Sequence, residues 1–169
     1  MATHAERRRL PYTAEQLFDL VADVERYPEF LPWCVGARIR ERKSNEIVAD
    51  LIIGYRMIRE RFTSRVVLDR AKRIDVAYSE GPFRYLNNHW VFEPASLPTG
   101  GEGGCRIDFF VDFEFRSRVL QKLIGVLFNE AVRRMVAAFE ARARQLYGEK
   151  SRPADAEAVA RGERDEIVR

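Results

Sequence analysis

The sequence predicts an α+β domain in which a curved antiparallel sheet of about six to seven strands wraps a long C-terminal helix. Two observations predict this fold class. Between residues 35 and 115, successive segments alternate apolar and polar residues and are separated by short turns, which is typical of antiparallel strands. The stretch that follows, from Ser117 to Tyr147, repeats its apolar residues with the period of an α-helix.

A strand and a short helix are expected at the start of the chain. Residues 3–10 form a charged segment that ends at Leu10-Pro11 and is predicted to be an edge strand. Thr13-Ala-Glu-Gln16 has the pattern of a capping box, in which the Thr13 hydroxyl accepts from the Gln16 N–H and the Gln16 side chain reaches back. The helix after this cap places four apolar residues on one face: Leu17, Leu20, Val21 and Val24. Tyr27-Pro28 is predicted to end the helix, before a proline-bounded aromatic turn at residues 29–33.

The predicted strands are recognised by alternation with a period of two. Five segments place one set of residues on a common side: Val35, Ala37 and Ile39; Ile47, Ala49, Leu51 and Ile53; Phe62, Ser64, Val66 and Leu68; Ile74, Val76 and Tyr78; and Asn88, Trp90 and Phe92. Residues 97–104 are rich in glycine and form a loop. The most regular strand follows, with Cys105, Ile107, Phe109, Val111, Phe113 and Phe115 on one side.

The last helix is predicted to be about 45 Å long, with Ser117 as its N-cap and Gly148 at its end. Its main apolar stripe contains Leu120, Ile124, Leu127, Phe128, Ala131, Val132, Met135, Ala138, Phe139 and Leu146. Val119, Leu123 and Val126 are apolar but lie off this stripe. Either the helix start packs on two sides, or these residues contact lipid or a partner.

Composition describes an ordinary globular domain. The chain has 169 residues, with 46% hydrophobic and 33% charged, so residues 1–148 are expected to form one domain. Residues 149–169 are charged, contain few large apolar side chains and are expected to be a disordered tail. No apolar run is long enough to span a bilayer, and no signal peptide is recognised, so the cytoplasm is expected. The net charge of +3 is compatible with anionic lipid or RNA.

The sequence offers no catalytic set. The two histidines, His4 and His89, are far apart and have no neighbours at metal-ligand spacing, so no metal site is predicted. Cys34 and Cys105 match no metal or disulfide pattern. Cys34 has no histidine near it in the sequence and is interpreted as a buried structural thiol. Binding is therefore favoured over catalysis.

One polar residue stands out in the predicted strands. Alternation from Phe62 places Glu60 on the inner side with Ile58, where a carboxylate needs a partner such as an arginine. A bulge near Gly54-Tyr55 would reverse this orientation. If Glu60 faces inward, it can orient a ligand's polar head or act as an acid or base.

Several stretches together resemble the coenzyme Q-binding Coq10 family, a branch of the START-like, polyketide-cyclase-like helix-grip proteins. They are Pro11-Tyr12 with Ala14-Glu-Gln-Leu17, Tyr27-Pro-Glu-Phe-Leu-Pro-Trp-Cys34, Glu60-Arg-Phe-Thr-Ser64, Gly81-Pro-Phe83, His89-Trp90, Asp112-Phe-Glu-Phe-Arg-Ser117, Phe128-Asn-Glu130 and Ala137-Ala-Phe-Glu140. The resemblance covers residues 3–148 and rests on the order and spacing of these motifs rather than on any one of them.

The resemblance implies a helix-grip fold with a hydrophobic tunnel for a polyprenyl quinone. It implies a non-enzymatic carrier or chaperone that presents ubiquinone, held without a covalent bond, to respiratory and quinone-biosynthesis enzymes. Combined with strand and helix periodicity, it implies a ligand lining of Trp33, Leu51, Ile53, Phe62, Trp90, Phe109, Val111, Phe113, Leu120, Ile124, Leu127, Phe128 and Val132.

Quinone transfer from a bilayer also needs a contact surface, for which Arg118, Val119, Lys122, Leu123 and Val126 are the candidates. On this interpretation the protein is peripheral at the inner membrane face.

Two other functions stay open. The same family contains a ribosome-association toxin (RatA) branch, and the polar side of the last helix, with Lys122, Arg133 and Arg144, is compatible with binding an RNA backbone. A small enzyme of the cyclase or dehydratase kind would depend on an inward Glu60.

Overall fold

The computed structural model describes residues 2–97 and 99–148. The predicted tail, residues 149–169, lies outside the described residues. Ten elements follow one another along the chain: β1 (Ala2–Leu10), α1 (Ala14–Ala22), the 3-10 helix η1 (Val24–Glu29), β2 (Cys34–Arg42), β3 (Glu46–Tyr55), β4 (Ile58–Asp69), β5 (Arg73–Glu80), β6 (Phe83–Ala95), β7 (Gly104–Phe115) and α2 (Arg118–Tyr147).

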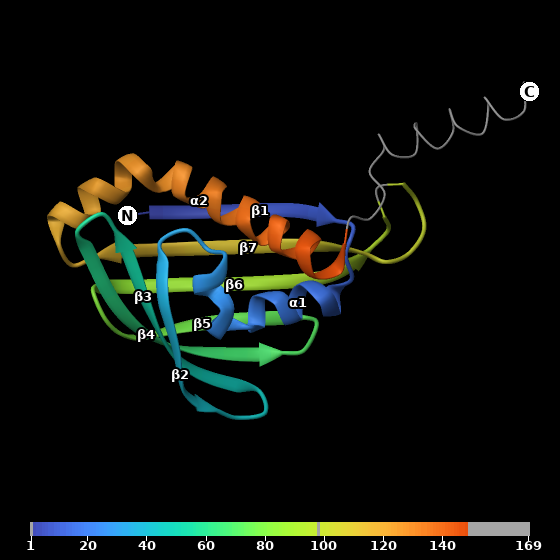
Figure 1. Ribbon diagram of the computed structural model, residues 1–169, viewed down its shortest axis with the longest axis horizontal. Coiled ribbons are helices and arrows are strands. Elements are labelled where there is room, and N and C mark those ends of the chain that lie inside the picture. The colour runs from blue at the N-terminus through green and yellow to red at the C-terminus, as the bar shows by residue number, and fades with distance from the viewer. Residues whose placement is uncertain (1, 98, 149–169) are drawn as a thin grey trace, which may run out of the picture.

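The seven strands form one antiparallel sheet in the order β1-β7-β6-β5-β4-β3-β2. From β2 to β7, each strand pairs with the next through a short connection, and β1 closes the far edge beside β7. The sheet curves, and α2 runs across its inner face, with α1 packed on the same side near the C-terminal end of α2 (Figure 1). The predicted fold class, the strand–helix–strands–helix order and the edge position of β1 are confirmed.

The capping box starts α1 as predicted. The N–H of Gln16 donates to the Thr13 hydroxyl at 3.1 Å, and the backbone N–H of Thr13 donates to the Gln16 side chain at 3.0 Å. The predicted end of this helix is wrong. The α-helix stops at Ala22, and residues 24–29 continue as a 3-10 helix that contains Pro28. Pro28 has no N–H, and its ring is incompatible with the preceding α-helical turn, so the chain tightens there instead.

One residue of β2 lies on the opposite side from the one predicted. Ala37 and Ile39 pair with Leu51 and Ala49 on the inner face, but the register shifts between Cys34 and Gly36. This bulge adds one residue to β2 and leaves Val35 exposed, where it packs over Gly54. Alternation fails at a bulge because two residues there oppose one.

Helix α2 begins after its predicted cap, since the N–H of Leu120 donates to the Ser117 hydroxyl at 3.3 Å, and it ends before Gly148. Its buried residues are Val132, at the middle of the helix, and Phe139 and Ala143 in its second half. Leu146 was predicted on the apolar stripe but is exposed. Tyr147 occupies the inner side of this last turn instead, with its hydroxyl donating to the Gln16 carbonyl at 2.9 Å.

Candidate functional site

An apolar cavity of about 320 Å³ lies between the inner face of the sheet and α2. Its floor comes from β3 to β7, its roof from α2, and one side from η1 and the turn before β2. Eleven of the thirteen residues predicted to line a ligand site line this cavity: Trp33, Leu51, Ile53, Phe62, Trp90, Phe109, Val111, Phe113, Ile124, Phe128 and Val132. The space lies under the first half of α2, which explains why the helix has no buried residue before Val132.

A second apolar cavity of about 120 Å³ adjoins the first. The other two predicted residues, Leu120 and Leu127, line this second space. The two cavities have five wall residues in common: Trp33, Ile53, Phe115, Ile124 and Ala131. The second cavity lies between the start of α2 and the tip of the β3–β4 hairpin. Because the two cavities share these wall residues, movement of the shared side chains would join them.

Glu60 lines the second cavity. It pairs with Ile53 across the β3–β4 ladder, where no register shift occurs, so the bulge considered near Gly54-Tyr55 is absent and the inward orientation is confirmed. Within the described part of the chain, no residue forms a hydrogen bond or an ion pair with Glu60. The expected arginine partner is therefore not found there. Half-buried at the margin of the cavity, Glu60 remains partly solvated.

Trp33 is held in an unusual backbone conformation. Its φ is 64°, in the left-handed region that bulky side chains rarely adopt. The N–H of Gly54 donates to the Trp33 carbonyl at 2.8 Å, and the indole packs edge-on against Tyr55 with ring centroids 6.4 Å apart. These contacts fix the Pro32-Trp33-Cys34 turn and place its indole in the wall of both cavities.

Some residues of irregular backbone line the main cavity and were not predicted. Tyr27 and Leu31 line the main cavity from η1 and the turn that follows it, where neither helix nor strand periodicity applies. The Tyr27 hydroxyl donates to the Val21 carbonyl, and burial raises the pKa of Tyr27. Ser64 and Asn88 add polar groups to the floor. Their inward direction follows from alternation, which could have identified them.

Both thiols are protonated near neutral pH. Burial raises the pKa of Cys34, whose thiol donates to the Gly36 carbonyl at 3.6 Å. Burial also raises the pKa of Cys105 to about 11. Cys34 lies in the cavity wall, and a protonated thiol is a poor nucleophile.

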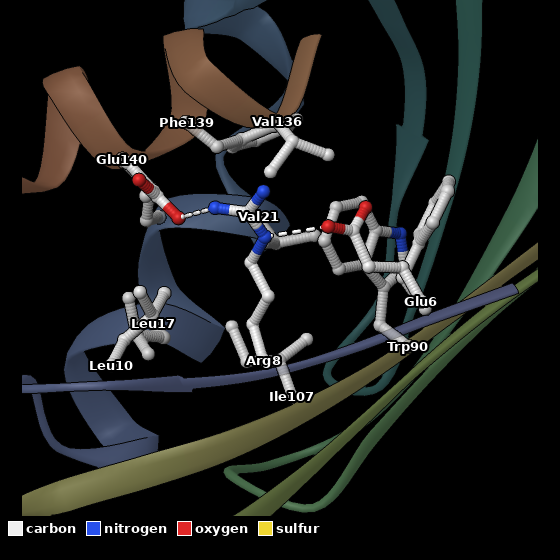
Figure 2. A pocket seen from close by; sticks show the side chains of 12 residues that line it. Glu6, Arg8, Leu10, Leu17, Val21, Trp90, Ile107, Val136, Phe139 and Glu140 are labelled. Carbon is white, nitrogen blue, oxygen red and sulfur yellow. Dashed lines mark hydrogen bonds and ion pairs between the residues drawn. The ribbon is translucent and has the colours of Figure 1, made fainter. Parts of the chain in front are cut away.

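A third, smaller cavity of about 50 Å³ shares Trp90, Phe109 and Phe139 with the main cavity. Figure 2 shows it from close by. Arg8 of β1 reaches across it to Glu140 of α2, and its Nε donates to Glu6 at 2.6 Å. Burial alone would raise the pKa of Glu6, but hydrogen bonds from Arg8 and His4 outweigh it and lower that pKa. This charged group ties the edge strand to α2 and leaves little room for a ligand.

The residues predicted for membrane or partner contact lie at the start of α2. Arg118, Val119, Lys122 and Val126 are exposed, whereas Leu123 is half-buried and lines the second cavity. Of the three cations considered for RNA binding, Arg133 is paired with Glu130 at 3.4 Å. Lys122 and Arg144 make no ion pair with any carboxylate in the described ranges.

The described residues contain neither a metal-binding cluster nor a membrane-spanning helix. No group of His, Cys, Asp or Glu side chains there has the arrangement of a metal site. None of the helices in that part of the chain has the length and apolarity needed to cross a bilayer.

Comparison with known proteins places these features in a family context. Residues 10–140 match the family described as polyketide cyclase / dehydrase and lipid transport. The protein named "Ribosome association toxin RatA" of Rickettsia prowazekii is 37% identical over 150 residues, which cover 86% of this chain and 99% of that protein. Its namesake in Pseudomonas aeruginosa is 40% identical over 149 residues, covering 88% and 100%. "Coenzyme Q-binding protein COQ10 homolog B, mitochondrial" of Xenopus laevis is 33% identical over 162 residues, covering 95% and 66%.

Solved structures share the same fold. An 18 kDa protein of Caulobacter crescentus superposes with a TM-score of 0.70 at 36% identity, covering 88% of this chain and 100% of that one. The Zhui aromatase/cyclase from a Streptomyces species superposes with a TM-score of 0.71 at 17% identity, covering 90% and 97%. The second likeness shows the fold alone.

Proposed function

The chain belongs to the polyketide cyclase / dehydrase and lipid transport family, and its relatives include both Coq10 and RatA proteins. From this premise we propose that it binds a polyprenyl quinone, ubiquinone, without transforming it. It would then serve as a carrier or chaperone that presents ubiquinone to respiratory and quinone-biosynthesis enzymes. Its place would be the cytoplasm, at the inner face of the membrane.

The observation that carries this proposal is the cavity itself. A volume of about 320 Å³, enclosed mainly by aliphatic and aromatic side chains, suits an apolar ligand. Most ligand pockets in proteins span about 300–1,000 Å³, and the adjoining space under the start of α2 extends this one. A polyprenyl tail is a chain of apolar units, so each lining residue that it covers adds a favourable free energy of apolar burial to binding.

The few polar groups in the cavity suit a quinone head. The Ser64 hydroxyl lies in the floor and can donate to a quinone carbonyl. Asn88 donates one amide hydrogen to the Phe110 carbonyl at 2.8 Å, which holds its side chain in place and leaves a second hydrogen for a ligand. Neutral hydrogen-bonding groups of this kind orient an uncharged head without the cost of a buried charge.

A binding role also agrees with the chemistry of the lining. The Cys34 thiol is protonated, Glu60 lies in the second cavity without a described partner, and neither has a histidine beside it. A general acid or base must itself lie within hydrogen-bonding distance of the reacting atom, and Glu60 lines the second cavity, apart from Ser64 and Asn88 in the floor of the main one. We therefore propose that ubiquinone leaves the cavity unchanged.

The test is to express the protein in a ubiquinone-producing host, extract it with organic solvent and quantify quinones by mass spectrometry. Ala131 lines both cavities, and Ala137 is exposed on the same helix. We expect near-stoichiometric ubiquinone with the wild type and with Ala137→Phe. The ubiquinone content of Ala131→Phe should be roughly a tenth of the wild-type content or less, because its ring would fill the ligand space.

Two results would contradict the proposal. One is an empty wild-type extract together with no change in Tm when ubiquinone is added. The other is equal quinone content in Ala131→Phe and Ala137→Phe, which would place the lipid outside the cavity.

A second candidate function is association with the ribosome. It is favoured by the relatives named as ribosome association toxins, which match this chain over nearly their whole length. On this alternative, the protein would block the joining of ribosomal subunits. Salt-dependent co-sedimentation with isolated subunits would support it, because contacts with phosphates weaken steeply as salt rises. Absence of co-sedimentation at low salt would count against it.

A further inference from the structure

Two segments meet at one end of the molecule. The tip of the β3–β4 hairpin, residues 55–59, lies beside the start of α2, residues 116–126 (Figure 1). Tyr55 and Ile58 from the hairpin line the second cavity together with Leu120 and Leu123 from the helix. We call these two segments the hairpin–helix end. The second cavity lies between them and shares five wall residues with the main cavity, so this end offers a path from the surface to the main cavity.

The most exposed large apolar side chains of the described residues lie at this end. Met57 is 99% exposed, Val126 83% and Val119 75%. Arg56 and Met57 form the two-residue turn of the hairpin, and Arg56 has a φ of 55°. A fully exposed methionine contributes no free energy of burial to the fold. Three exposed apolar side chains beside the second cavity therefore indicate a contact surface.

Cations surround these apolar residues. Arg116 donates to the Phe83 carbonyl at 3.1 Å and Arg56 packs over the Tyr55 ring, but neither contact neutralises the charge. None of the following side chains forms an ion pair with a carboxylate of the described residues: Arg56, Arg59, Arg84, Arg116, Arg118 and Lys122. Three carboxylates, Glu60, Glu80 and Glu114, share this region and are outnumbered. At the opposite end most cations are paired, for example Arg70 with Asp19, and Arg42 with Glu25 at 2.6 Å.

We propose that the hairpin–helix end docks on an anionic phospholipid surface. Met57, Val119 and Val126 would enter the interface, and the surrounding cations would pair with lipid phosphates. RNA phosphates could pair with the cations, but RNA offers no apolar environment for the exposed side chains. An anionic membrane accounts for both the cations and the exposed apolar residues. The inference rests on the proposed function, since it supplies the route by which a quinone passes between bilayer and cavity.

The test is co-sedimentation of the full chain with vesicles of phosphatidylcholine, with and without phosphatidylglycerol. Wild-type protein should bind the anionic vesicles more tightly. Replacing Arg56 and Arg59 by serine should weaken this binding by about fivefold for each cation. Met57→Ser should weaken it by about tenfold, because a buried methionine side chain returns to water. Val126→Ser provides a second apolar variant in the helix.

Matched controls lie elsewhere on the same protein. Leu146→Ser removes an exposed apolar side chain from the last turn of α2, and Lys72→Ser removes an exposed, unpaired cation from the β4–β5 turn. Both should bind vesicles like the wild type. All substituted residues are exposed, so an unchanged Tm should accompany each variant.

The outcomes separate docking from ligand binding. Equal losses in hairpin–helix and control variants, or no losses, would overturn the docking inference even if ubiquinone co-purifies. Loss of subunit co-sedimentation in the arginine variants, with vesicle binding unchanged, would also overturn it and assign the surface to RNA. If the protein binds vesicles specifically but its extract contains no quinone, the docking inference stands and the proposal that ubiquinone is the ligand is wrong.

Discussion

Asp50 shows how one residue on the outer face of the sheet links stability to pH. The residue is 3% exposed, and its carboxylate accepts from the Thr63 hydroxyl at 2.5 Å and from Arg40 Nε at 2.7 Å. Burial alone would raise the pKa of Asp50, but these two hydrogen bonds and the charge of Arg40 outweigh it and lower that pKa. The ionised carboxylate is therefore part of the folded structure.

We expect Asp50→Asn to lower the free energy of unfolding by about 1.5–3 kcal/mol at pH 7, because hydrogen bonds to the charge are lost. The folded pKa lies below the unfolded value of about 3.9, so this contribution is present above that pH and is lost as pH falls through the folded pKa. Urea unfolding of both proteins should therefore show their stabilities converging toward low pH.

Thr63→Val is the companion variant, since it removes one of the two hydrogen bonds and keeps the charge. A constant difference between wild type and Asp50→Asn from neutral to strongly acidic pH would contradict this account of Asp50.

At the scale of single elements, α2 combines two functions in one helix. Its second half is anchored by Phe139, which packs edge-on against Trp90 and Tyr27 with centroid distances of 5.2 and 5.7 Å. Its first half roofs the cavities, and Gly125 lies in the middle of it. A glycine weakens a helix by about 1 kcal/mol relative to alanine, so the half that forms the roof has the lower helix propensity at this position.

Gly125→Ala should raise the free energy of unfolding by about 1 kcal/mol, since alanine favours a helix and loses less backbone entropy on folding. A Cβ at this position would meet nothing within 4 Å, so no clash offsets the gain. Urea unfolding measures the difference. Ala137→Gly, the reverse change at an exposed site of the same helix, should lower stability by a similar amount. A destabilised Gly125→Ala would contradict the open environment described for Gly125.

The elements also show what the sequence could and could not predict. Alternation identified all the central strands. Strand and helix periodicity combined with the family resemblance gave thirteen lining residues, and all of them lie in cavity walls. Alternation misplaced Val35, because a bulge leaves no mark in the pattern. Tyr27 and Leu31 were missed because the 3-10 helix and the turn after it have no repeating face. The absence of a described partner for Glu60 depends on tertiary distances, which no local pattern contains.

At the scale of the whole molecule, the cavity has a cost in stability. Empty space closed off from water lowers stability by about 24 cal/mol for each Å³. The cavity of about 320 Å³ is partly open, so this cost applies to the part of it that water does not fill. The net stability of a domain is about 5–15 kcal/mol. A void on this scale is difficult to explain as imperfect packing, which supports the view that a ligand fills it.

This cost yields a prediction that separates stability from binding. Without ligand, Ala131→Phe should be more stable than Ala137→Phe by about 1–3 kcal/mol, because its ring fills apolar space while both pay the same loss of helix propensity. Adding ubiquinone at about a hundred times its Kd should raise the stability of the wild type and of Ala137→Phe by about 2.7 kcal/mol. Ala131→Phe should gain little. Thermal unfolding with and without quinone measures all four differences, and a ligand-free Ala131→Phe less stable than Ala137→Phe would mean that the space under α2 is already filled by side chains.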